Sequence, residues 1–243
     1  MDAKLEALVE AFPRLLEGLW ITLQLTAGGA SLALIVALTL GMLARSPNIL
    51  VRGTARTIIE FFRGTSLVVQ LFWLFFVLPQ LGVEFSAMFV GILALGLNYG
   101  AYSAEVVRGS INAVSTGQWE ATWALSMGPV HRMRRVIFPQ AWALMIPSLT
   151  NYLIHLLKGT AIVSFITMHD LAFHVDQLRR GTGTFFAYGV VGLLGYFLVA
   201  YLLTLGMNAL EIRAKHRLGQ GQSLREILSL RPPRTTVVRE GGA

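Results

Sequence analysis

Five long apolar runs constrain the fold of this chain more than any other feature. A helix needs about 20 apolar residues to cross the hydrocarbon core of a bilayer. Its backbone N–H and C=O groups must bond within the segment, because no water is available there. The runs cover Gly18–Ala44, Gly64–Val83, Phe85–Ala104, Val136–Met168 and Gly181–Leu210. The sequence therefore predicts an all-α integral membrane protein with five transmembrane helices.

Composition supports this class and excludes several functions. Hydrophobic residues make up 54% of the 243 residues and charged residues only 14%. There is no cysteine, which excludes disulfides, thiolate metal sites and cysteine nucleophiles. The five histidines show no spacing with carboxylates that is typical of a metal site. Paired catalytic carboxylates are also missing, so we predict neither a metal site nor an enzyme.

The positions of the basic residues predict the orientation in the membrane. Most of the 20 lysines and arginines fall between runs one and two, between runs three and four, or after run five. Cytoplasmic loops carry such an excess of positive charge. We expect the N-terminus outside and the C-terminus in the cytoplasm. The charges flank apolar runs instead of forming one patch, so they indicate no nucleic acid partner.

The predicted spans and orientation divide the chain into three parts. Residues 1–17 form an extracytoplasmic N-terminal segment, residues 18–212 form the five-helix domain, and residues 213–243 form a cytoplasmic tail. The first run continues past its small residues at 27–30 as far as Leu43, which is longer than a signal peptide requires. We therefore expect it to be a retained transmembrane helix.

A polar segment at about 113–135, between runs three and four, predicts a short cytoplasmic helix. Ser115 and Gln118 have the spacing of a capping box at its start, and Gly128-Pro129 would end it. At helical spacing, one face would carry Trp119, Thr122, Trp123 and Ser126. Such a helix can lie on the lipid surface or in a groove of a cytosolic protein, and the pattern alone leaves both open.

Four separated motifs resemble a known family. Gly117-Gln118-Trp119-Glu120-Ala121, followed by residues 135–141, resembles the EAA loop of ATP-binding-cassette importer permeases. Residues 60–70, 101–109 and 157–160 resemble the polar amino-acid branch of that family. The resemblance covers Leu16 to Glu211, with the motifs in the family's order. It implies a type I ABC importer permease core.

The resemblance assigns the polar segment to contact with an ATPase subunit. It implies a coupling helix that docks in a groove of the ATPase, through Gly117, Gln118, Trp119, Glu120, Ala121, Thr122, Ser126 and Gly128. Two of these positions depart from the family pattern. Thr122 stands where the family has alanine, and Ser126 stands where it has glycine.

The energy source is expected in another chain. The only lysines are Lys4, Lys158 and Lys215, and none lies in a G-x-x-x-x-G-K-[ST] phosphate-binding loop. We therefore expect this chain to bind no cofactor, with ATP and Mg²⁺ bound by cytosolic ABC ATPase subunits. By resemblance, the further partners are a second permease copy or a homologous permease and an extracytoplasmic substrate-binding protein. The location is the bacterial inner membrane.

Polar residues within the apolar runs predict the substrate site. Asn151, His155 and Lys158 lie four and three residues apart and share one helical face, and Asn98 and Tyr102 give run three a similar face. Ionisable groups inside a membrane are costly and are mostly functional. Lys158 can neutralise a substrate carboxylate. The alternative is that Lys158 extends to the interface while the other side chains join helices.

Charged residues near the inner end of run three form a further candidate. Glu105 and Arg108 lie one helical turn apart, and Arg63 precedes run two. The family resemblance suggests a gate or a structural role. An ordinary surface pair worth about 0.2–0.5 kcal/mol is the alternative.

Between runs four and five, residues 170–180 predict a short polar helix outside the membrane. We expect most of it to be solvated, and by resemblance this face receives the binding protein. The predicted cargo is a polar amino acid or a small zwitterion such as ectoine or hydroxyectoine. An ion-coupled secondary transporter or channel subunit is the alternative function.

Overall fold

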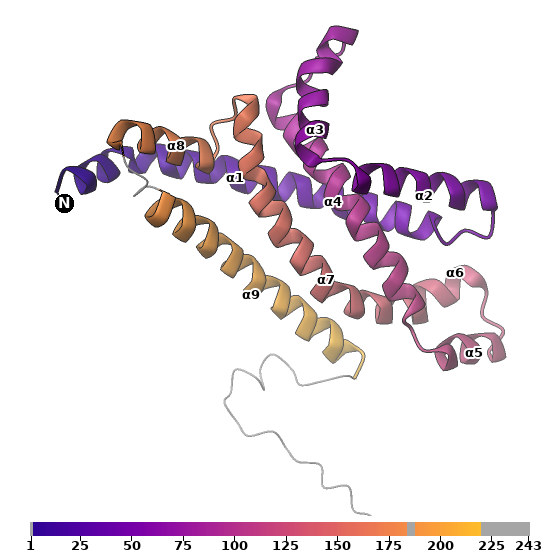
Figure 1. The fold of residues 1–243 in the computed structure, drawn as a ribbon. Coiled ribbons are helices and arrows are strands. Elements are labelled where there is room, and N and C mark those ends of the chain that lie inside the picture. Colours follow the sequence, from indigo (N-terminus) through magenta and orange to yellow (C-terminus); the bar gives the residue numbers. More distant parts are fainter. Residues whose placement is uncertain (1, 184–187, 220–243) are drawn as a thin grey trace, which may run out of the picture.

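The computed structural model describes residues 2–183 and 188–219, and within these ranges every element is a helix or helical turn (Figure 1). Four helical stretches are long and apolar enough to cross a membrane, and a bent helix pair makes a possible fifth span. The four stretches are Glu6–Leu43, Ala87–Asn112, Pro129–Ile166 and Val190–Arg217. The predicted all-α membrane fold is therefore confirmed.

Helix α1 (Asp2–Leu43) is longer than the first apolar run. It begins well before Gly18 and continues through Pro13 without ending. Helix α8 (Leu171–Thr182) packs beside its N-terminal part, and α4 (Ala87–Asn112) packs along much of the rest (Figure 1).

Small residues allow α1 and α4 to approach closely. A Cβ atom at Gly41 would lie 2.7 Å from the carbonyl oxygen of Ala104, and one at Gly100 would lie 2.8 Å from Val36 Cβ. In lipid, helices gain little from hydrophobic burial against one another, and close packing of small residues stabilises their association instead. The buried residues of α1 and α4 thus form the centre of the domain.

The second predicted span differs from a straight membrane helix. The chain first forms α2 (Ile49–Gly64), which Asn48 caps through its side chain and which packs through Ala55 and Ile59. It then turns by 99° into α3 (Leu67–Phe72), which a π turn and a 3₁₀ turn extend to Leu81. The apolar run at Gly64–Val83 is therefore only the second half of a bent pair.

The fourth span is one long helical stretch. It comprises α6 (Pro129–Arg132), the π turn η3 (Met133–Ile137), α7 (Phe138–Gly159) and a 3₁₀ segment (Thr160–Ile166). It begins earlier than the predicted start at Val136. Thr167, with φ of 65°, terminates it.

The last helix, α9 (Leu193–Arg217), follows the π turn η5 (Tyr188–Gly192) and packs mainly on α7. Residues 184–187 of the fifth predicted span and residues 220–243 of the predicted tail lie outside the described residues.

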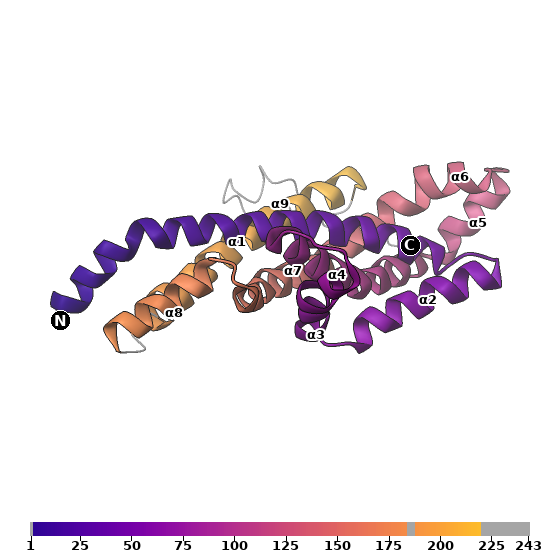
Figure 2. The same ribbon diagram turned by 90° about the horizontal axis from the view of Figure 1, so that it is seen from above.

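The two short helices outside the spans lie at opposite ends of the molecule. Figures 1 and 2 both place α8 beside the N-terminus, while α5 (Thr116–Ala124) and α6 lie at the other end. The candidate site residues are distributed between these two ends and the helices that join them.

Candidate functional site

The predicted coupling residues lie on α5 and in the turn that follows it, and most of them are exposed. Six of the eight have exposed side chains or, for the glycines, exposed backbone: Gly117, Gln118, Glu120, Ala121, Ser126 and Gly128. A Cβ atom added at Gly117 or at Gly128 would meet nothing within 4 Å. Packing within this chain therefore does not require glycine at either position.

Helix α5 begins where the sequence predicts, but the capping box does not form. Ser115 is the N-cap residue, yet its hydroxyl makes no capping hydrogen bond. The Gln118 side chain instead accepts a hydrogen bond from Gln140 Nε2 at 3.1 Å. The capping prediction is wrong because Gln118 joins the start of α5 to α7.

The end of α5 lies four residues before the predicted stop. The helix ends at Ala124, and the N–H groups of Ser126 and Met127 donate to the carbonyl oxygens of Trp123 and Thr122 at 2.8 and 3.0 Å. This is the Schellman arrangement, in which the residue at the Ser126 position is usually glycine because it is left-handed. Ser126 has φ of 53°. Gly128 and Pro129 instead begin α6.

The predicted single face of α5 is divided between the protein interior and solvent. Thr122 is only 2% exposed, and Trp119 is half-buried against the core around Ile137. Trp123 and Leu125 are 59% and 74% exposed, and nearby Val130 is 78% exposed. Because the Thr122 side chain is buried within this chain, it is not exposed to a partner, and its assignment to the ATPase contact stays a prediction. We call Trp123, Leu125 and Val130 the apolar tip.

Arg45, which the sequence showed only as one of many loop charges, lies just after α1 and contacts the end of α4 and the Trp119 ring of α5. Its Nε donates to Asn112 Oδ1 at 3.0 Å, and its guanidinium lies 5.6 Å from the centre of the Trp119 ring. Burial and the positive charge of Arg108 lower the pKa of Arg45. No local motif identifies this residue, since both contacts come from distant segments.

Asn98 stabilises the bend between α2 and α3. Its Nδ2 donates to the carbonyl oxygen of Phe62 at 3.0 Å and to Gln70 Oε1 at 3.3 Å. Gln70 Nε2 donates to the same Phe62 oxygen and to Thr65 Oγ1. These amides satisfy carbonyl groups at the end of α2 that have no partner within the helix. Asn98 is 5% exposed.

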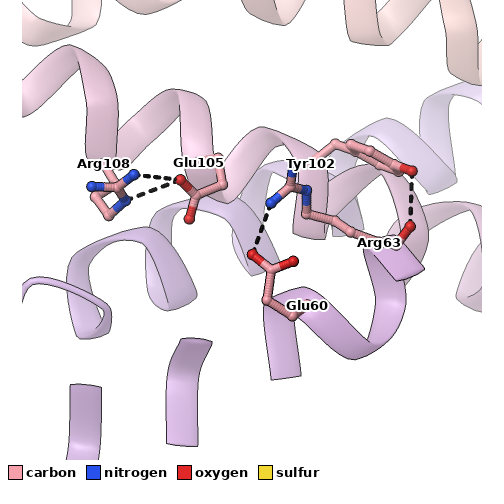
Figure 3. A network of polar contacts seen from close by, with 5 residues as sticks. All are labelled: Glu60, Arg63, Tyr102, Glu105 and Arg108. Carbon is pink, nitrogen blue, oxygen red and sulfur yellow. Dashed lines mark hydrogen bonds and ion pairs between the residues drawn. The ribbon is translucent and has the colours of Figure 1, made fainter. Parts of the chain in front are cut away.

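Tyr102 and the predicted gating residues surround the same bend (Figure 3). The Tyr102 hydroxyl donates to the carbonyl oxygen of Arg63 at 3.0 Å, and the Arg63 guanidinium lies 5.4 Å from the Tyr102 ring centre. Arg63 pairs with Glu60 at 2.9 Å, whereas Glu105 pairs with Arg108 at 2.6 Å. Figure 3 shows two separate ion pairs: Arg63 runs beside Tyr102 and pairs with Glu60, while Glu105 and Arg108 lie off to one side on α4.

Aromatic contacts bring part of the predicted substrate site together. Tyr102 on α4 stacks on Tyr152 of α7 with ring centres 5.8 Å apart, and Tyr152 lies 6.5 Å from His155. Asn151, His155 and Lys158 are all exposed on α7, and Lys158 occupies its last turn. The structure thus joins Tyr102 to the α7 face, while the Asn98 amide is directed to the α2–α3 bend.

The α8 end contains a carboxyl group that the sequence placed on a solvated surface. Asp170 caps α8 by accepting from Phe173 N at 3.0 Å, and its side chain is fully buried. The Tyr196 hydroxyl donates to its Oδ2 at 3.4 Å. Burial raises the pKa of Asp170 to about 6, although the backbone hydrogen bonds oppose this shift. The prediction of a short helix here is confirmed.

Comparison with known proteins identifies the family. Residues 29–216 match the family described as binding-protein-dependent transport system inner membrane component. The chain is 42% identical over 200 residues to the probable amino-acid ABC transporter permease protein y4tF of Sinorhizobium fredii, covering 80% of this chain and 84% of the relative. It is 33% identical over 216 residues to the arginine transport system permease protein ArtQ of Bacillus subtilis, covering 88% and 99% of the two chains.

A solved structure agrees in fold and in sequence. The crystal structure of an amino acid ABC transporter with histidines matches with a TM-score of 0.77 and 34% identity, over 85% of this chain and 96% of that one. The predicted family and the type I importer architecture are therefore confirmed. This chain belongs to the binding-protein-dependent inner membrane permeases, as an amino-acid ABC importer permease.

Proposed function

We propose that this chain forms the membrane translocation path of an ATP-driven importer, with α5 and the apolar tip seated on a cytosolic ABC ATPase. The exposed apolar tip is the observation that supports this contact most strongly. Three large apolar side chains at the end of a membrane protein are costly in water, and a partner surface would cover them. The open space around Gly117 would allow that partner to approach the backbone.

Removing the tip tests the contact. Trp123→Ala should weaken binding of the cognate ATPase by about 100-fold, because exposed aromatic residues at interface centres carry much of the binding energy. Trp20→Ala is a matched control, since Trp20 is 62% exposed and lies on α1, far from α5. Equal binding by the parent and by Trp123→Ala would contradict the proposed contact.

The cargo would be a polar amino acid or a similar small zwitterion such as ectoine. Lys158 supports this proposal, because its exposed ammonium can neutralise a substrate carboxylate. Asn151 and His155 on the same face supply polar contacts, and the Tyr102–Tyr152 pair would form a wall of the site. In this arrangement, Asn98 stabilises the α2–α3 bend and so positions Tyr102 in the wall of the site. It would contact the cargo directly only if the helices rearrange during transport.

Uptake into proteoliposomes tests the cargo and its site. Permease, ATPase and binding protein would be reconstituted and given glutamine, arginine, histidine or ectoine. Lys158→Ala should keep the ATPase bound and lose uptake, whereas Lys158→Arg should retain substantial uptake because it keeps the positive charge. Unchanged uptake by Lys158→Ala would remove Lys158 from the site. Uptake driven by an ion gradient without ATP would favour the ion-coupled alternative.

The remaining partners follow from the orientation. With the N-terminus outside, the exposed side of α8 would receive the extracytoplasmic binding protein, while ATP and Mg²⁺ would bind only in the ATPase. A second permease, identical or homologous, would complete the path. The Glu105–Arg108 pair lies between the bend and the α5 end, where it could respond to ATPase movement as a gate. Protease access to each end in sealed vesicles would test this orientation.

A further inference from the structure

A long groove separates α9 from α1 on the surface of α7. Helix α1 packs chiefly on α4 and α9 packs chiefly on α7, so a strip of α7 between them remains open. The groove has a volume of about 770 Å³ and is lined along most of its length by apolar side chains such as Leu34, Trp142 and Leu153. Its lining comes from helical stretches that are long and apolar enough to cross a membrane.

The groove is charged at only one end. Arg213 and Arg217 of α9 line it beside Phe138 and Pro139, at the end of the molecule that carries α5. None of the ion pairs found among the described residues involves Arg213 or Arg217. The site therefore combines an apolar slot and two exposed guanidinium groups at its mouth.

We propose that this groove binds one anionic phospholipid, with an acyl chain along α7 and the headgroup phosphate at Arg213 and Arg217. Guanidinium groups bind phosphate oxygens through paired hydrogen bonds. Basic pockets between transmembrane helices favour anionic lipid headgroups. The length also fits, because the lining of α7 from Phe138 to Leu156 corresponds to about 27 Å of helix, close to the thickness of a bilayer core. The groove shares Tyr152 with the proposed cargo site, but the proposal holds whichever cargo is carried.

Native mass spectrometry of the full chain, extracted from vesicles of equal phosphatidylglycerol and phosphatidylcholine, tests this site. We expect the parent to retain one phosphatidylglycerol per chain, with roughly tenfold preference over phosphatidylcholine, as two interfacial arginines can provide. The double variant Arg213→Ala/Arg217→Ala should reduce this preference to less than twofold. Arg134→Ala/Arg135→Ala is the matched control, because these two arginines are exposed near the same end but do not line the groove.

A second variant separates the slot from the charges. Leu34→Trp places a larger side chain in the groove without changing charge, and it should abolish retention of either lipid. Equal retention of both lipids by the parent would overturn the proposal, as would an equal loss of preference in the Arg134/Arg135 control. If Leu34→Trp instead dissociates permease pairs and the parent retains no lipid, the groove holds a second copy of the chain, and the proposal is wrong.

Discussion

The two ends of the molecule hold their short helices by opposite means. At one end, α8 is anchored by the buried Asp170, by Leu171 and Val175 in a small core, and by close contact with Gly18 of α1. At the other end, α5 leaves Trp123 and Leu125 exposed and has open space beside Gly117. The comparison teaches that α8 is held by packing within the chain, whereas much of the α5 surface is left uncovered by this chain.

The largest expected effect concerns the buried acid. The pKa of Asp170 rises from 3.8 to about 6 on folding, so its protonated form is favoured in the folded state. The folded state therefore gains the full benefit of holding a neutral Asp170 below pH 3.8. It loses this stability as the pH rises through 6, because the buried carboxylate must then ionise. The loss amounts to about 3 kcal/mol, from two pKa units of about 1.4 kcal/mol each.

Asp170→Asn should remove this dependence on pH, because asparagine can still cap α8 but cannot ionise. Unfolding in mixed micelles between pH 4 and pH 7.5 measures it. The variant should be more stable than the parent at pH 7.5 and similar near pH 4. A parent whose stability does not change over this range would show that Asp170 is not held in a desolvated site.

A pair of glycines makes the comparison between the ends direct. At Gly18, an added Cβ would lie 2.8 Å from the carbonyl oxygen of Asp170 and 2.6 Å from His174 Cδ2. Because that backbone cannot move easily, Gly18→Ala should lower the free energy of unfolding by about 2 kcal/mol. Gly117→Ala should cause no loss in the isolated chain, since alanine favours the helix and meets no neighbour. Equal losses in the two variants would contradict the assigned difference in packing.

Ser126, at the end of α5, adopts a left-handed backbone conformation. Replacing it is expected to have a smaller effect, and one that increases stability. Ser126→Gly should stabilise the local structure by about 1 kcal/mol, because glycine adopts this conformation without a steric penalty. Hydrogen exchange at Leu125 and Met127 should slow by several-fold. Ser126→Ala is the control that keeps the penalty, and faster exchange in the glycine variant would argue against the Schellman arrangement.

The smallest expected effect concerns the contact between Arg45 and α5. Arg45→Gln should remove the contact with the Trp119 ring, which at a partly exposed site is worth about 0.5–1 kcal/mol. Hydrogen exchange across α5 should then accelerate two- to fivefold while α8 is unaffected. Arg56→Gln on α2 is the control, since Arg56 is exposed. A change at α8 as large as at α5 would mean that the two ends are not independent.

The spans could be predicted from sequence because their apolar residues follow from the membrane itself. The bend after α2 could not, since Gln70 and Asn98 must meet Phe62 across the fold before the broken backbone is satisfied. The start of α5 was visible in the local pattern, but its exposed face was not. Which side of a short helix is buried depends on distant partners, here η3 and the end of α1.

The candidate site residues were predictable from sequence only to the same extent. The sequence alone makes Lys158 a candidate, because a charge within an apolar run is costly wherever the run folds. The burial of Asp170 was missed, because a polar residue at the edge of a run looks solvated until Thr22 and Tyr196 are placed around it. Arg45 gave no signal for the same reason.

The unbroken helical stretch from Pro129 to Ile166 has a mechanical consequence. It carries Val130 of the apolar tip near its beginning and Lys158 near its end, about 42 Å apart along the axis at 1.5 Å per residue. No loop interrupts the path between them. Were this stretch to pivot as one body by about 5° near its middle, both residues would shift by about 2 Å in opposite directions, so a displacement of α6 would reach Lys158 as a sideways step.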